Sequence, residues 1–244
     1  MLDSAFPALL LGFALGLKHS TEADHLAAVS ALVSDTHGVR RGAIVGAFWG
    51  LGHLLTLFAL GAILVMFRLP MTPRISWTLE FIVALVLIGL GVRTLILALR
   101  GRYHFHVHDH AGHPHAHVHL HALKQTAHEH SADAHNHLPQ PVPMSGIRPL
   151  LVGMAHGLAG TASLTLLILT TISSRTLGIA YLGIFGAGAL LGMAGFGAVL
   201  GAPLGRAAQR LGWLRALRFA AGAFSFGLGV FLAFHAFLPS EFPF

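Results

Sequence analysis

Histidines and acids interrupt one apolar stretch near the start of this 244-residue sequence. The segment Lys18–His25 carries two imidazoles, at His19 and His25, together with Glu22 and Asp24. Two imidazoles and a carboxylate suit a borderline divalent cation such as Ni²⁺, Co²⁺ or Zn²⁺. On a regular helix, at about 100° per residue, His19, Glu22 and His25 would share one face. Asp24 would point away from that face, so either the helix is broken here or Asp24 orients an imidazole without binding the ion.

Further candidate ligands lie alone in other apolar stretches. We predict that His53 is a ligand, although a single histidine in such a stretch can instead bond a backbone carbonyl of a neighbouring helix. His156 is a candidate of the same kind farther along the chain. Thr161 and Ser163 follow it, and their hydroxyls are predicted either to line an ion path or to bond back to their own helix.

A histidine-rich segment stands between the apolar stretches, with 13 histidines in the 34 residues 104–137. Its core alternates histidine with other residues, at His104, His106, His108, His110, His113, His115, His117, His119 and His121. Neutral imidazole binds Ni²⁺, Zn²⁺, Co²⁺ and Cu²⁺, so we predict that this segment captures metal without selecting one. Its low apolar content predicts a loop that is disordered without metal.

The composition excludes several classes of protein. Charged residues make up 10% of the chain and hydrophobic residues 55%, and the mean hydropathy is +0.71. A soluble domain carries roughly 25% charged residues, so a soluble enzyme and a nucleic-acid binder are both excluded. The chain has no cysteine, so a metal must be bound through nitrogen and oxygen. The N-terminal residues are interpreted as mature sequence, because Asp3 stands where a secretory signal carries positive charge.

Six stretches are apolar over the length of about 20 residues that a membrane helix needs. They are residues 6–33, 42–67, 75–99, 149–174, 176–205 and 219–238. We therefore predict an all-α membrane protein with six transmembrane helices. Ten Lys and Arg residues fall on one side of this topology and three on the other. The positive-inside rule then places both termini outside a cytoplasmic membrane and the histidine-rich loop in the cytoplasm.

The apolar stretches repeat. Gly89–Val92 in the third stretch recurs as Gly227–Val230 in the sixth, 138 residues later, and the first and second stretches match the fourth and fifth at offsets of 141 and 140. Because each copy has three spans, the second copy enters the membrane from the opposite side. Two inverted three-helix repeats, at 1–100 and 148–244, with the loop 101–147 between them, are typical of secondary transporters.

Three motifs resemble those of a known family. His19-x4-Asp24-His25 resembles the H-x4-D-H signature of the nickel/cobalt transporter superfamily, and Phe48–His53 is similar to its Leu-Gly-His motif. The segment His156–Ser163 is similar to that of the shorter urease-accessory-type nickel permeases. The resemblance implies movement of Ni²⁺ or Co²⁺ across the cytoplasmic membrane, with His19, Asp24 and His25 as ligands.

The sequence thus predicts a permease for Ni²⁺ and/or Co²⁺, working in the direction of uptake, with no prosthetic group and no enzymatic activity. The alternatives are an efflux transporter and, less favoured, a membrane metalloenzyme; the H-E-x-x-H motif of metalloproteases is absent from the chain. The implied partners are the metal ion, the lipid bilayer and cytoplasmic metallochaperones.

Overall fold

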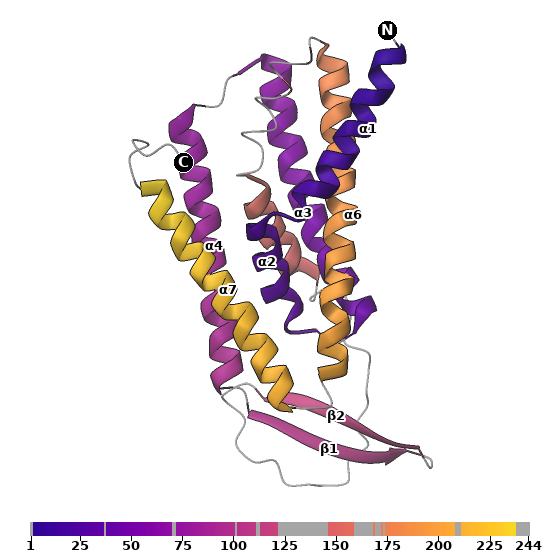
Figure 1. Ribbon diagram of the computed structural model, residues 1–244, viewed down its shortest axis with the longest axis vertical. Coiled ribbons are helices and arrows are strands. Elements are labelled where there is room, and N and C mark those ends of the chain that lie inside the picture. Colours follow the sequence, from indigo (N-terminus) through magenta and orange to yellow (C-terminus); the bar gives the residue numbers. More distant parts are fainter. Residues whose placement is uncertain are drawn as a thin grey trace.

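The computed structural model describes residues 2–36, 38–69, 72–100, 102–110, 113–121, 146–158, 168, 172, 174–207 and 211–237. Long helices run roughly alongside one another through the molecule (Figure 1). The helices are α1 (Leu2–His19), α2 (Ala23–Val33), α3 (Val39–Phe67), α4 (Pro73–Arg100), a helix over 146–158, α6 (Arg175–Ala207) and α7 (Leu211–Phe237). Two strands, β1 (Arg102–His110) and β2 (His113–His121), form the rest of the regular structure among these residues.

Among the described residues, four helices are long and apolar enough to cross a membrane: α3, α4, α6 and α7. α3, α4 and α6 coincide with predicted spans to within three residues at each end, whereas α7 begins eight residues before the predicted sixth span and ends within one residue of it. The first predicted span, 6–33, is apolar but consists of two shorter helices, α1 and α2. The fourth begins with the helix over 146–158, and most of its remainder lies outside the described residues. The structure therefore confirms a multi-pass apolar helical protein, while the number of six spans stays a prediction.

The outer surface of these helices is apolar. Phe6 on α1, Val199 on α6 and Phe231 on α7 expose more than half of their surface. Soluble monomers rarely expose contiguous apolar surface on this scale. Such side chains suit contact with lipid, and the structure in this respect agrees with the composition.

The break between α1 and α2 follows from local hydrogen bonds. The Ser20 hydroxyl donates to the carbonyl of Leu17 at 2.7 Å, and the Thr21 hydroxyl donates to that of Lys18 at 2.6 Å. Side-chain bonds of this kind compete with the continuing helix. Glu22 then takes an extended backbone conformation, with φ −64° and ψ 150°, and α2 begins at the next residue. The sequence had left a broken helix as one of two alternatives, and the structure shows the break.

Glycines bring the long helices into backbone contact. On α3, Gly42 lies against the backbone of Gly197 and Gly46 against that of Met193, both on α6. A Cβ atom at Gly46 would overlap a carbonyl group, so no larger residue fits there. Small residues spaced by four along α3 therefore allow close packing of helices, as in other membrane proteins.

The contact between α4 and α7 is reciprocal. A Cβ atom at Gly91 would lie 2.7 Å from the Cα atom of Phe226, and one at Gly229 would lie 2.8 Å from the amide nitrogen of Ile88. Gly229 and Phe226 each follow their counterparts, Gly91 and Ile88, by 138 residues, the offset of the sequence repeat. Each helix thus uses the same two positions to contact the other, as a two-fold relation between repeats requires.

The histidine-rich segment differs from the prediction. Residues 102–121 form an antiparallel β-hairpin, in which His104 pairs with His119 and His108 with His115. The hairpin lies at the end of the molecule opposite the start of α1 (Figure 1). The prediction of a disordered loop is wrong over these strands, because alternation with a period of two is a strand pattern. Residues 122–145 lie outside the described part of the chain.

Candidate metal centre

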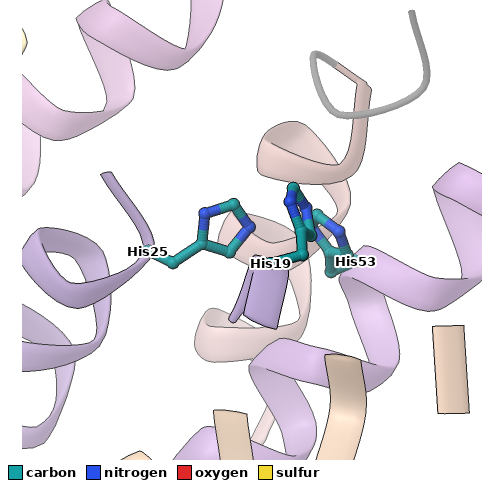
Figure 2. Close-up of side chains that lie close together, drawn as sticks. All are labelled: His19, His25 and His53. Carbon is teal, nitrogen blue, oxygen red and sulfur yellow. The ribbon is translucent and has the colours of Figure 1, made fainter. Parts of the chain in front are cut away.

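Three imidazoles converge where α1 ends and α2 begins. His19 closes α1, His25 lies in the first turn of α2, and His53 comes from the middle of α3. The ring of His19 lies 4.3 Å from that of His25 and 5.3 Å from that of His53, measured between centroids. One nitrogen from each ring lies within 4.8 Å of the others (Figure 2). His53 is completely buried and His25 is 2% exposed.

The ring nitrogens divide into two groups, those that contact carboxylates and those that do not. Nδ1 of His25 lies 2.8 Å from Oδ1 of Asp24, and Nδ1 of His19 lies 3.1 Å from Oε1 of Glu22. Nε2 of His19, Nε2 of His25 and both nitrogens of His53 are buried without a hydrogen-bond partner. An imidazole that contacts a carboxylate through one nitrogen and is free at the other is oriented as metal-binding histidines are. The structure therefore shows the broken helix, the first alternative from the sequence, and it also places the Asp24 carboxylate in contact with the imidazole of His25.

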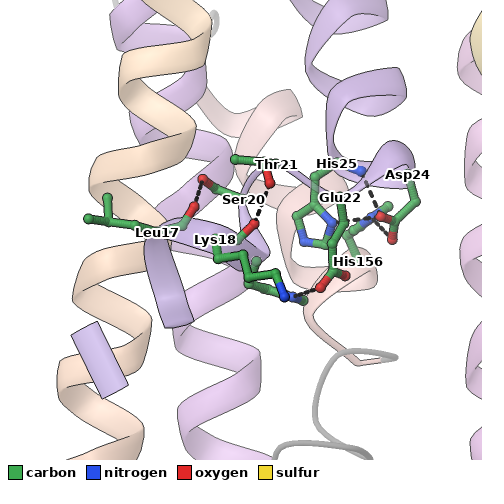
Figure 3. A network of polar contacts seen from close by, with 9 residues as sticks. Leu17, Lys18, Ser20, Thr21, Glu22, Asp24, His25 and His156 are labelled. Atoms are coloured by element: carbon green, nitrogen blue, oxygen red, sulfur yellow. Dashed lines mark hydrogen bonds and ion pairs between the residues drawn. The ribbon is translucent and has the colours of Figure 1, made fainter. Parts of the chain in front are cut away.

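Asp24 also joins the two halves of the chain. Its Oδ2 lies 3.0 Å from Nε2 of His156, which is 132 residues away on the helix over 146–158 (Figure 3). His156 is 1% exposed, and its Nδ1 is buried without a partner. Asp24, His25 and His156 form a second group whose ligand atoms lie within 4.8 Å of one another. The two groups share His25.

Close backbone packing holds His156 in place. Gly157, the next residue, lies against α3, where an added Cβ atom would be 2.5 Å from the carbonyl oxygen of His53. Gly153 lies against the backbone of Trp49 on the same helix. The helix over 146–158 and α3 are therefore in contact at the level of the histidines.

An aromatic side chain that the sequence reasoning missed adjoins both groups. The Trp49 ring lies 5.5 Å from that of His25 and 5.7 Å from that of His156, and its Nε1 is buried without a partner. Trp49 precedes His53 by four residues, which places both on one face of α3. That spacing could have identified it.

The remaining predicted ligands and lining residues lie outside this cluster of histidines or outside the part of the chain that the structure describes. Thr161 and Ser163 are not among the described residues. The histidines of the hairpin, His104 to His121, are described by backbone and register alone, and the hairpin is a separate element from the helices that carry His19, His25 and His53.

A second charged cluster stands at the opposite end of α2. Oδ2 of Asp35 lies 2.6 Å from Nη1 of Arg93 on α4 and 3.9 Å from Nη1 of Arg148. Arg218 of α7, 3% exposed, donates from Nε to the carbonyl oxygen of Ser34 at 2.8 Å. Sequence reasoning missed this cluster, because its members are separated by long stretches of chain.

Comparison with known proteins gives one informative match. The chain is 32% identical over 208 residues to the urease accessory protein UreH of Bacillus sp. (strain TB-90). The alignment covers 83% of this chain and 80% of that protein. No family model and no solved structure matches the chain.

Proposed function

This chain belongs to the family of the urease accessory protein UreH, among the nickel/cobalt transporters, and on that premise we propose that it is a permease for Ni²⁺ and/or Co²⁺. The direction that we propose is uptake across the cytoplasmic membrane. The observation that carries the proposal is the group His19, His25 and His53, whose unpartnered nitrogens meet inside an apolar helical protein.

The chemistry of this group favours a transition-metal ion. Buried polar atoms without partners are unfavourable, and a metal ion would satisfy several of them at once. Imidazole nitrogen suits Ni²⁺, Co²⁺ and Zn²⁺, whereas Mg²⁺ and Ca²⁺ prefer oxygen ligands. Asp24 and Glu22, through their contacts with His25 and His19, would make the imidazoles better donors and supply negative charge close to the cation.

Movement of the ion is proposed to follow from the architecture. The break between α1 and α2 carries the ligands, as discontinuous helices do in many secondary transporters. The reciprocal packing of α4 on α7 supports the two inverted repeats. Rocking of one repeat against the other would then expose the ion to each side in turn.

The remaining parts of the proposal concern the orientation of the chain in the membrane and the supply of metal to it. The ten-to-three distribution of Lys and Arg supports a cytoplasmic location for the hairpin and an outside location for both termini. We propose that the hairpin histidines, together with cytoplasmic metallochaperones, receive arriving metal. The same location would also let the hairpin feed an exporter, so efflux is the second candidate function.

Accumulation of radioactive ⁶³Ni²⁺ in cells tests both the function and its direction. Cells that express the chain are expected to contain more nickel than cells with the empty vector, and a panel with Co²⁺, Zn²⁺ and Mn²⁺ would define the selectivity. Lower cellular nickel would replace uptake by efflux. Unchanged nickel and cobalt, with the protein present in the membrane, would overturn the transport proposal and return attention to a metalloenzyme, for which bound iron or zinc in the purified protein is the test.

A further inference from the structure

The two groups of ligand atoms meet at one side chain. His25 presents Nδ1 toward Asp24 and has Nε2 free on the side of His19 and His53. Its ring lies 4.7 Å from that of His156 and 5.2 Å from that of His53, whereas the rings of His53 and His156 are 6.4 Å apart. His25 therefore stands between two sets of potential ligands.

Building on the transport function proposed above, we propose that the transported ion occupies two neighbouring positions in turn. The first is held by His19, His25 and His53, and the second by Asp24, His25 and His156. His25 is the ligand that both positions share.

The shared ligand makes the transfer favourable. An ion that leaves Nε2 of His25 in the first position has the other face of the same ring, together with Asp24 and His156, as its next set of ligands, so it passes between two adjacent groups of protein ligands inside an apolar environment. Two divalent ions on either side of one imidazole would repel each other strongly, so the positions fill one at a time.

The second position also connects the ion to the movement of the repeats. The first position is built entirely from α1, α2 and α3. The second needs His156 from the helix over 146–158, in the other predicted repeat, opposite Asp24 on α2. Because the second position is complete only while these helices are in contact, displacement of one repeat from the other separates His156 from Asp24 and His25 and weakens the binding of the ion.

Two variants separate this relay from a single composite site. In His156→Gln, the glutamine amide can still donate to Asp24, but an amide is a poor ligand for these metals. In His53→Ala, the first position loses a ligand and the second keeps all of its own. Each variant is made in a full-length background in which the 13 histidines of 104–137 are replaced by asparagine, so that bound nickel reports the membrane part alone. His235→Gln, an exposed histidine near the end of α7, is the matched control.

The measurements are ⁶³Ni²⁺ bound per purified chain at equilibrium and ⁶³Ni²⁺ transported into proteoliposomes. The relay predicts that both variants still bind one ion, while transport falls by about tenfold or more in each. Transport by His156→Gln at the rate of the parent would overturn the relay, because His156 would then only position Asp24. Loss of binding in a monodisperse variant would overturn it as well, in favour of one composite site.

Transport by the parent, which is the background without loop histidines, distinguishes failure of the relay from failure of the proposed transport function. If neither the wild-type chain nor the background without loop histidines transports nickel, the proposed function fails and the relay fails with it. A parent that transports nickel alongside a fully active His156→Gln removes the relay alone. If gel filtration shows that one variant does not fold, the other decides, because each makes the same prediction from the opposite position.

Discussion

An aspartate lies near each end of α2, but the side chains that surround the two aspartates differ. Asp24 and Asp35 are aspartates of nearly equal exposure, 26% and 28%, and each contacts side chains from elsewhere in the fold. Asp24 lies between His25 and His156, whereas Asp35 faces Arg93 and Arg148. An imidazole keeps a lone pair that a metal can take, but a guanidinium has none. The first end can therefore exchange its contacts for a metal ion, whereas the arginines at the second end cannot bind one.

The largest effect is expected from the histidine that both ligand groups share. His25→Ala removes a ligand from each group, so ⁶³Ni²⁺ accumulation is expected to fall to the level of the empty vector. The control is Ser30→Ala on the same helix, whose hydroxyl donates to the carbonyl of Ala27. Nickel accumulation by His25→Ala at the wild-type rate would show that the cluster is not the ion site.

The acids beside the imidazoles are expected to have smaller and unequal effects. Asp24→Asn is expected to lower nickel affinity by about 10- to 100-fold, the usual range for a residue that orients a metal ligand. Glu22→Gln is expected to lower it less, because the Glu22 side chain is 55% exposed and lies against His19, at 3.1 Å. Equilibrium binding of ⁶³Ni²⁺ to the two purified variants, in the background without loop histidines, measures the difference. A reversed order would contradict the assignment of Asp24 as the central acid.

At the other end of α2, the expected effects are on stability and not on the ion. Arg218→Met keeps the length of the side chain but leaves the carbonyl of Ser34 without this donor. Loss of a buried hydrogen bond to a charged group costs about 1–3 kcal/mol, so the thermal midpoint in detergent is expected to fall. Nickel affinity is expected to stay at the wild-type value. A large loss of nickel affinity in this variant, with an unchanged thermal midpoint, would show that this end of α2 also contributes to ion binding.

Asp35→Asn is expected to have the smallest effect. The Arg93–Asp35 pair is partly exposed, with 40% and 28% of the side-chain surfaces accessible. Such pairs contribute about 0–1 kcal/mol and less at high salt. Thermal unfolding at low and high salt should therefore separate wild type from the variant mainly at low salt. Abolished nickel binding in this variant would mean that both ends of α2 belong to one functional unit.

Within single segments, sequence reasoning was effective. The apolar stretches 42–67, 75–99, 176–205 and 219–238 correspond to α3, α4, α6 and α7, because twenty apolar residues in a row have few alternatives to a membrane helix. It failed over β1 and β2, where the composition was given more weight than the period-two alternation. The pair Asp35 and Arg93 went unnoticed because 58 residues separate its members.

The sequence by itself determined that this chain is an apolar helical protein whose first apolar stretch contains His19, Glu22, Asp24 and His25, since these properties depend on neighbouring residues. The break between α1 and α2 was one of two alternatives until the structure showed it. Only the tertiary structure decided that His53 joins His19 and His25, and that His156 lies on the far side of Asp24. Helical periodicity relates residues on one helix, but it does not give the rotation of one helix against another. Here that rotation is set by backbone contacts of glycines between residues far apart in the chain. Examples are Gly157, which packs against α3, and Gly46 of α3, which packs against α6.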